Sequence, residues 1–288
     1  MDQPICGAEE IRAFNARYNV DLLSFADNHS ITGYGVCLKR TGIRQSPSST
    51  PVLDDDGLDL RQESSCLPCQ PVVICGTNGL WYFIQTENCA GWTLFDSIGL
   101  IDRKSFERLV GCEDFYIVTD CSVTLGGTKC FLSARLPAEG EGRVRLPYAG
   151  DGHTEWKSFP VCEGLHKGFL PYTRCNLLAQ AMRLLHLPYD WGEKNGSVDC
   201  SALTVYTYAC CGVKLPRNSS AQAAVHGPVS VHTGVTNALP GDIIHQPGHV
   251  MLYLGDQMVL HASHSRGKVC VTPYPIPDAS GDGISGAS

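Results

Sequence analysis

Residues 195–219 read NGSVDCSALTVYTYACCGVKLPRNS and hold three of the fifteen cysteines of the chain. Cys200 differs from the other two, because an aspartate precedes it, a serine follows it and a glycine-containing loop leads into it. It could be a reactive thiol, half of a disulfide, a metal ligand or a small core residue. The flanking residues predict a helix that starts near Asp199 or Cys200 and ends before Gly212, which takes the usual C-terminal glycine position.

A cysteine on the first turn of a helix lies beside unpaired backbone N–H groups and the positive end of the helix dipole. Both favour an anion, so this placement predicts a lowered pKa for the Cys200 thiol and a thiolate that can attack a carbonyl carbon. Such chemistry also needs a base within hydrogen-bond reach and a third group that orients the base.

Two of the ten histidines meet this requirement in the sequence pattern. His249 opens the predicted strand HVMLYLG, and His261 lies near the end of the predicted strand QMVLHAS. A three-residue turn at 255–257 would place Met251 opposite His261, with His249 as its diagonal neighbour on the same face. Diagonal neighbours are about 7–8 Å apart at Cβ, so the two imidazoles could meet. The pattern predicts a Cys–His–His arrangement of nucleophile, base and orienting group.

Composition limits the classes of function. The chain has 288 residues and a net charge of −7, so it lacks the basic balance that nucleic-acid binding requires. No apolar run reaches the roughly 20 residues that span a bilayer. The first twenty residues show no basic start followed by an apolar stretch. We therefore expect a cytoplasmic protein; the alternative is an exported protein whose signal peptide is not part of this chain.

The other cysteines admit a second interpretation. Cys66 and Cys69 form the motif CLPC, and Cys75 and Cys89 follow, which could indicate a zinc ribbon. The second pair is not spaced as CxxC, however, and the residues between read as strand. We expect reduced thiols in a β core, with no metal and no cofactor.

The residue composition and the spacing of apolar residues change twice along the chain. Residues 8–20 predict an amphipathic helix, and 44–57 have the Ser, Pro and Asp content of a loop. From about 66 to 160, short runs rich in β-branched and aromatic residues predict closely spaced strands, as in small β-barrels. Near residue 170 the spacing becomes helical, with Thr173 as a plausible N-cap.

Two segments carry a resemblance to a family. They are GSVDCSALTVYTYACCGVKLPRNSSAQ and LPGDIIHQPGHVMLYLGDQMVLHAS, which resemble the NlpC/P60 cysteine peptidases. The family pattern is a DCSG-like helix start, an LPR(T/N)S loop, a PGD turn and an HVxxYLG strand followed by (I/L)HA. Cys200, His249 and His261 match its nucleophile, base and orienting histidine. Alanine stands where the family usually has the glycine of DCSG, and alanine suits a helix interior.

The upstream sequence resembles the subgroup in which bacterial SH3-like (SH3b) domains precede the peptidase. The resemblance implies an α+β protein, with a papain-like NlpC/P60 catalytic domain after small β-barrel SH3b domains. The expected divisions are a helix and loop segment at 1–50, a first SH3b barrel at 51–105, a second at 106–165 and the peptidase domain at 166–288.

This subgroup includes murein-recycling endopeptidases. The resemblance therefore implies hydrolysis of the γ-D-Glu–L-diamino acid bond in a murein peptide with a free N-terminal L-Ala. It also implies roles for residues that match the motifs. Asp199 and Ser201 would hold polar groups of the substrate, with Asp199 facing the free amine or capping the helix, or both. Arg217 and Ser219 would meet the D-Glu carboxylate.

Aromatic residues complete the implied site. Tyr189 and Trp191 match a YxW pair, in which the Tyr hydroxyl lies near the nucleophile and helps bind the oxyanion. Tyr82, or Trp81, would close the site from the first SH3b domain, although Trp81 could equally be a core aromatic.

Three other functions stay open at this point. The chain could be an exported hydrolase of intact peptidoglycan that uses its SH3b domains as wall anchors. It could be a wall-binding module with an inert peptidase fold, or an interaction protein built on a zinc ribbon.

Overall fold

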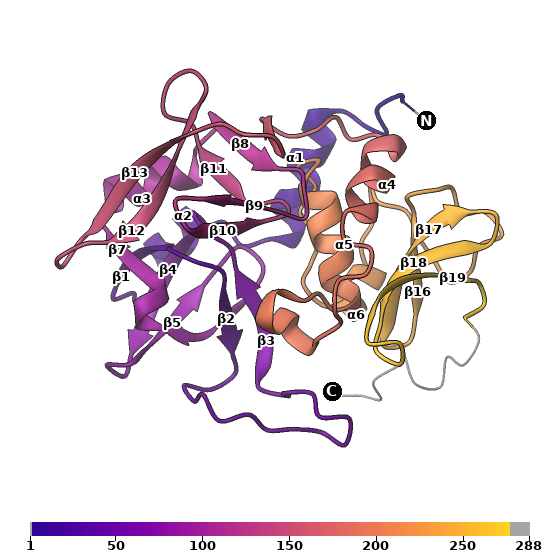
Figure 1. Cartoon of the computed structure of the whole chain (residues 1–288), viewed down its shortest axis with the longest axis horizontal. Helices are drawn as coiled ribbons and strands as arrows, with labels where there is room; N and C mark the ends of the chain where they lie inside the picture. Colours follow the sequence, from indigo (N-terminus) through magenta and orange to yellow (C-terminus); the bar gives the residue numbers. More distant parts are fainter. Residues whose placement is uncertain (1, 277–288) are drawn as a thin grey trace. The chain divides into compact units, whose positions relative to one another are not determined.

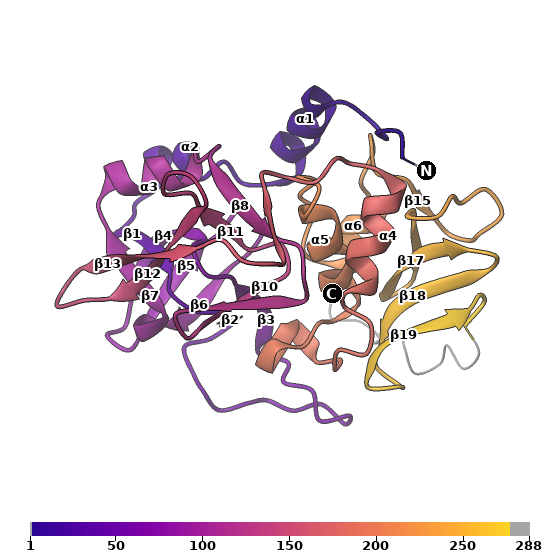
Figure 2. The same ribbon diagram turned by 45° about the horizontal axis from the view of Figure 1, so that its top comes forward.

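A computed structural model describes residues 2–276, except the side chain of Asn195 (Figures 1 and 2). It divides into two compact units. Unit 1 comprises Met1–Asn19 and Leu170–Ser288, and unit 2 comprises Val20–Phe169. Residues 277–288 of the expected peptidase domain lie outside the described residues.

Unit 1 contains a five-stranded sheet in the order β15-β16-β17-β18-β19. Its β15–β16 pair is parallel and the other pairs are antiparallel. Helix α5 packs on β17 and β18, and α4 packs on α5, as Figure 2 shows. The elements of unit 1 are α1 (Ala8–Tyr18), α4 (Arg174–Met182), a 3-10 helix (Trp191–Gly196), α5 (Cys200–Ala209), α6 (Ser219–Ala223), β15 (Val231–His232), β16 (Ile243–Gln246), β17 (His249–Gly255), β18 (Met258–Ser263) and β19 (Lys268–Pro273).

The predicted helix beginning at Asp199 or Cys200 is confirmed as α5. Asp199 is its N-cap and accepts a hydrogen bond from Ala202 N–H at 2.8 Å. Gly212 follows the helix with a φ of +80°, a conformation that glycine adopts without a steric cost. Almost every residue of α5 is buried, so the helix lies within the core of unit 1 and carries Cys200 into it.

The hairpin that carries both histidines has the predicted register but not the predicted turn. Its turn has two residues, Asp256 and Gln257, both with positive φ, and Gly255 pairs with Met258. An irregularity between Tyr253 and Gly255 adds one unpaired residue to β17. Beyond it, Leu252 pairs with Leu260. Continuing this register by one residue places Met251 opposite His261, as the three-residue turn predicted.

Helix α1 confirms the helix predicted over 8–20, and it belongs to unit 1. The Asn15 side chain donates a hydrogen bond to the Gly212 carbonyl and accepts one from Lys214 N–H, each at 2.8 Å. Tyr18 accepts a bond from His226 N–H. These contacts hold the segment between α5 and the LPRNS loop, and the residues that follow α6, against a helix about 200 residues away in sequence.

Unit 2 is built mostly of antiparallel strands. Seven strands form one sheet in the order β3-β2-β6-β5-β4-β1-β7, and the other seven form the sheets β9–β10, β11–β8–β14 and β12–β13. Its elements are α2 (Leu22–Asn28), β1 (Gly33–Cys37), β2 (Thr41–Arg44), β3 (Gln62–Cys66), β4 (Pro71–Thr77), β5 (Trp81–Gln85), β6 (Ala90–Leu94), a 3-10 helix (Phe95–Ser97), β7 (Ile98–Ile101), α3 (Arg103–Val110), β8 (Phe115–Val118), β9 (Ser122–Leu125), β10 (Thr128–Phe131), β11 (Arg135–Pro137), β12 (Arg143–Ala149), β13 (Thr154–Pro160) and β14 (Leu165–Lys167).

The separate helix and loop segment expected at 1–50 differs from the structure. Strands β1 and β2 pair with strands from 62–101, because their buried side chains share one core with them. The closely spaced strands predicted over 66–160 are present. Two successive SH3b barrels stay a prediction.

The cysteines of unit 2, like the others among the described residues, are thiols and not halves of a disulfide. Cys37 and Cys66 are fully buried in an apolar core cluster, and Cys89 packs against it. Within residues 2–276 no group of three or more His, Cys, Asp or Glu side chains is placed to hold a metal ion.

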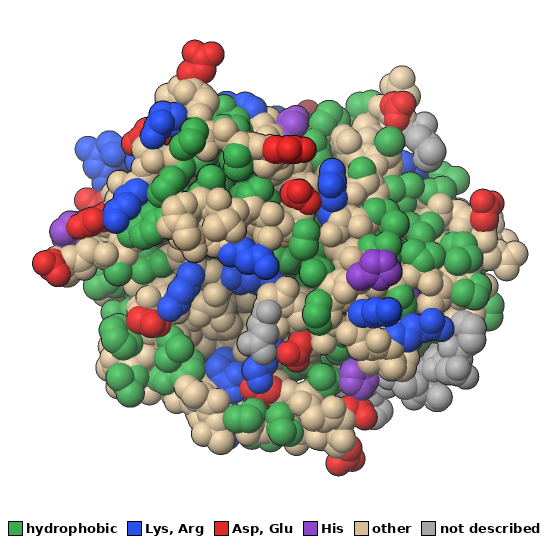
Figure 3. Space-filling view, viewed as in Figure 1, with side chains coloured by type: hydrophobic (Ala, Val, Ile, Leu, Met, Phe, Trp, Pro, Cys, Tyr) green, Lys and Arg blue, Asp and Glu red, His purple; other side chains and the backbone are tan. Residues whose placement is uncertain are grey.

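Two observations bear on the expectation that the protein neither spans a membrane nor binds nucleic acid. Over the described residues, no helix combines the length and the apolar character needed to cross a bilayer. On the face in Figure 3, acidic and basic side chains are interspersed.

The docking of α1 gives a stability prediction. Asn15→Ala removes two side-chain hydrogen bonds to the backbone of the segment after α5, so we expect it to lower the free energy of unfolding by about 1–3 kcal/mol. Chemical denaturation measures this change. Arg12→Ala is the matched control: Arg12 is exposed on the same helix, and its loss should change stability by less than about 0.5 kcal/mol. Equal effects of the two variants would contradict the docking.

Candidate active site

The two predicted histidines meet in the interior of unit 1. His249 Nε2 lies 2.9 Å from His261 Nδ1, and the rings are edge to face with centroids 5.1 Å apart. Both side chains are buried, His261 completely. The pairing follows from the hairpin register, because diagonal neighbours on one face of a sheet are within reach of two imidazoles.

Cys200 is brought to the same strand. It is the first residue of α5, and its thiol lies against the backbone N–H of Val250, which directly follows His249. The α5–β17 packing therefore places Cys200, His249 and His261, the predicted nucleophile, base and orienting histidine, in one part of unit 1. Val250 was not predicted as a site residue, because a backbone donor leaves no signal in the side-chain pattern.

The pKa of the Cys200 thiol is raised, whereas the sequence predicted a lowered pKa. Burial raises it to about 12, and the Asp199 carboxylate raises it as well. The N–H groups of Val250 and Ser201 and the charge of Arg217 lower it, but by less. The helix start contributes in the predicted direction, and desolvation of the buried sulfur outweighs it. The thiolate must therefore form by proton transfer to a base.

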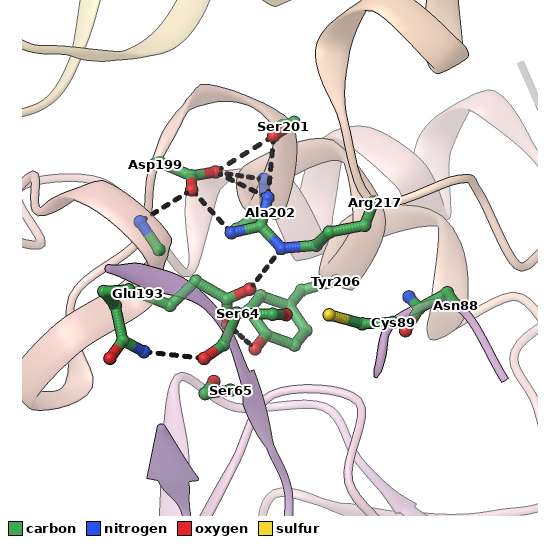
Figure 4. Close-up of polar contacts among 12 residues, drawn as sticks. Ser64, Ser65, Asn88, Cys89, Glu193, Asp199, Ser201, Ala202, Tyr206 and Arg217 are labelled. Atoms are coloured by element: carbon green, nitrogen blue, oxygen red, sulfur yellow. Dashed lines mark hydrogen bonds and ion pairs between the residues drawn. The ribbon is translucent and has the colours of Figure 1, made fainter. Parts of the chain in front are cut away.

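A buried ion-pair network surrounds the start of α5, as Figure 4 shows. The Arg217 guanidinium contacts both carboxylate oxygens of Asp199, at 2.6 and 3.2 Å, and the Ser201 hydroxyl at 2.8 Å. Its Nε lies 3.0 Å from a carboxylate oxygen of Glu193, and Tyr206 donates a hydrogen bond to that carboxylate. All five side chains are buried. Burial lowers the pKa of Arg217, but the Asp199 and Glu193 carboxylates together outweigh it and raise that pKa above its usual range.

Glu193 and Tyr206 were missed by the sequence analysis. Glu193 has a φ of +66°, which is uncommon for a residue with a side chain, and it follows Gly192 in the loop before Cys200. We infer that the ion pair between the Glu193 carboxylate and Arg217 offsets the backbone strain of this conformation. Gln222 was also missed; its amide donates to the carbonyls of Ser201 and Pro216 and accepts from Thr204, so it ties α5 to the LPRNS loop.

Asp199 and Arg217 form an ion pair with each other. Asp199 caps α5, accepts from Gly192 N–H at 3.2 Å and pairs with Arg217. The cap predicted for Asp199 is therefore present. Arg217 directs four contacts to protein groups, and it holds Asp199 in place. The predicted contact of Arg217 with a substrate carboxylate stays untested.

The other predicted binding residues come from several elements, and Tyr189 forms a bridge with Val198, two residues before Cys200. Tyr189 is half-buried, and its ring packs 5.3 Å from the ring of His264. Trp191 opens the 3-10 helix before α5, and Ser219 is the first residue of α6. Tyr82 lies on β5 of unit 2 against its core cluster, and Trp81 is buried there. The substrate roles of these residues stay predictions.

The NlpC/P60 family model matches residues 186–276, the segment that carries the three site residues. Among curated relatives, the peptidoglycan endopeptidase RipB of Mycobacterium tuberculosis is 42% identical over 90 residues, which are 29% of this chain and 35% of that protein. Dipeptidyl-peptidase 6 of Lysinibacillus sphaericus is 34% identical over 99 residues, 34% of this chain and 35% of that protein. The chain thus spans about a third of these relatives.

Solved structures show the same fold over most of the chain. An NlpC/P60 family protein from Bacillus cereus has a TM-score of 0.68 at 17% identity, over 87% of this chain and 97% of that one. An NlpC/P60 endopeptidase from Photobacterium damselae has a TM-score of 0.72 at 16% identity, over 96% of this chain and 88% of that one.

The raised thiol pKa gives a labelling prediction. With His249 as proton acceptor, iodoacetamide should alkylate Cys200 at pH 7; His249→Ala removes that acceptor and leaves a thiol whose pKa is raised by burial. Its labelling rate should then fall by roughly a hundredfold or more and rise about tenfold per pH unit from pH 7 to 9. Peptide mass spectrometry measures both rates. The exposed Cys162 and Cys175 are internal controls and should label alike in both proteins. Equal labelling of Cys200 would contradict the role of His249.

The ion-pair network gives a second prediction. Arg217→Ala leaves the Asp199 and Glu193 carboxylates buried without their cation, so we expect a loss of about 3–5 kcal/mol in the free energy of unfolding. The exposed Arg266→Ala is the control and should have little effect. A small loss, comparable to that of the control, would mean that the pair is not needed.

Proposed function

We propose that this protein is a cysteine endopeptidase that hydrolyses peptide bonds of peptidoglycan. The observation that carries the proposal is the buried 2.9 Å contact between His249 Nε2 and His261 Nδ1, next to a cysteine at a helix start. The relatives that are named endopeptidases support it.

The geometry supports a sequence of proton movements. Because Nε2 of His249 faces His261, Nδ1 is the nitrogen that can accept the Cys200 proton. The thiolate then attacks the scissile carbonyl carbon, with the Val250 N–H beside the sulfur. The imidazolium of His249 gives its proton to the leaving amine, and water hydrolyses the acyl-enzyme with His249 as base. His261 keeps His249 in orientation throughout.

We further propose the γ-D-Glu–L-diamino acid bond of a murein peptide with a free N-terminal L-Ala as the substrate bond, in the cytoplasm and for recycling. One relative is named a dipeptidyl-peptidase, a name that denotes the release of dipeptides. Release of L-Ala-D-Glu from such a peptide would be a reaction of that kind. Asp199 is the carboxylate beside the nucleophile that could face the substrate amine, with Arg217 keeping it in position.

A second candidate is a hydrolase of intact peptidoglycan. It is favoured by the relative named peptidoglycan endopeptidase, which has the higher identity to this chain of the two relatives described above. The two candidates share the bond chemistry and differ in what precedes the L-Ala.

Cleavage of defined peptides tests both. We expect L-Ala-γ-D-Glu-diamino acid peptides to be cut before the diamino acid, as mass spectrometry of the products would show, and Cys200→Ser to abolish the cut. N-acetylation of the L-Ala should lower kcat/KM by roughly a hundredfold or more, because a charge-assisted contact is lost and the acetyl group adds bulk. Similar rates on free and acetylated peptides, with release from insoluble sacculi, would replace recycling by wall hydrolysis. No cleavage of any of these substrates would overturn the peptidase proposal.

A further inference from the structure

His261 has a second neighbour group on the side away from His249. Its Nε2 lies 3.1 Å from the hydroxyl oxygen of Thr272 and 3.7 Å from the Cys270 sulfur. In the β18–β19 register His261 pairs with Cys270, so Thr272 is its diagonal neighbour on the same face. His261 is fully buried and Thr272 is 1% exposed.

The protons of the two imidazoles are coupled. For His249 to accept the thiol proton at Nδ1, its own proton must be on Nε2 and be donated to His261 Nδ1. The proton of His261 must then be on Nε2, where burial makes an unpaired N–H costly. The Thr272 hydroxyl is the oxygen acceptor at that nitrogen. With the His261 proton on Nδ1, His249 would carry its proton on Nδ1 and could not act as the base.

We propose that Thr272 is a positioning residue for the reaction: its hydroxyl accepts the Nε2 proton of His261 and so holds both histidines in the tautomers that leave His249 Nδ1 ready for the thiol proton. This rests on the proposed peptidase function. Cys270 contributes less, because a thiol sulfur is a weak acceptor and lies farther away.

The first test needs no substrate. In the Cys200→Ser protein, ¹⁵N NMR of the imidazoles reports which nitrogen of each ring carries the proton. We expect His261 to be protonated at Nε2 in the protein with Thr272, and the Nδ1–H form to gain population in Thr272→Val. His261 protonated at Nδ1 with Thr272 present would overturn the proposal, and this result would leave the peptidase function itself untouched.

Kinetics are the second test. Thr272→Val keeps the shape of the side chain and should lower kcat by roughly ten- to a hundredfold with KM little changed, on the scale of one buried hydrogen bond. Thr272→Ser should restore most of the loss. The acid limb of the kcat profile should move to lower pH in Thr272→Val, because a protonated histidine pair loses an acceptor and gives up its proton more readily.

Two variants separate this role from packing. Thr207→Val changes another fully buried threonine, on α5, whose hydroxyl donates to Leu203 O, and it should leave kcat and the pH profile unchanged. Cys270→Ala should cost less than Thr272→Val. If Cys270→Ala costs more, or if Thr272→Ser is as impaired as Thr272→Val, Thr272 does not hold the tautomer. If Thr272→Val does not fold, the serine variant and the NMR of the Thr272 protein still decide.

Discussion

The ion pair between Asp199 and Arg217 holds the start of α5, and the candidate site depends on it. Asp199 caps the helix that begins with Cys200, so a shift of its carboxylate would move the proposed nucleophile. Arg217 balances that carboxylate, and Glu193 and Tyr206 fix Arg217 from the other side. Such a buried network adds little to stability compared with apolar packing, but breaking it is costly. We infer that it orients the site, and that Asp199 both caps the helix and sets the charge beside the thiol.

Because the pKa of Cys200 is raised, its reactivity depends on the hydrogen-bond chain from His249 through His261 to Thr272. A sulfur that is buried and lies beside a carboxylate does not ionise by itself near neutral pH. Reactivity must then come from a base whose proton positions are fixed in advance. The register of the hairpin β17–β18 brings together His249, the proposed base, and His261, and β19 adds the Thr272 hydroxyl beside His261. Strands β17, β18 and β19 thus contribute His249, His261 and Thr272, which form a hydrogen-bond chain in the core of unit 1.

Several features were predictable because they depend on neighbours a few residues apart. The Asp199 cap, the helix start at Cys200 and the glycine after the helix follow from local backbone chemistry. The alternation of strand side chains fixes His249 and His261 on one face, and the register held although the turn has two residues and the pairing includes an irregularity. Glu193, Tyr206 and Thr272 could not be predicted in this way, because their partners come from other elements and the residues around them carry no local signal.

The sequence by itself therefore determined which residues could do the chemistry: a cysteine at a capped helix start and two histidines in phase on a hairpin. Only the tertiary structure decided how they behave. Burial of Cys200 against β17 reversed the expected direction of its pKa, because desolvation of a thiolate outweighs a helix dipole. Packing paired Arg217 with the carboxylates of Glu193 and Asp199, and it placed α1 against residues of the segment 170–276. These outcomes depend on which distant segments exclude water from one another, and no local pattern carries that information.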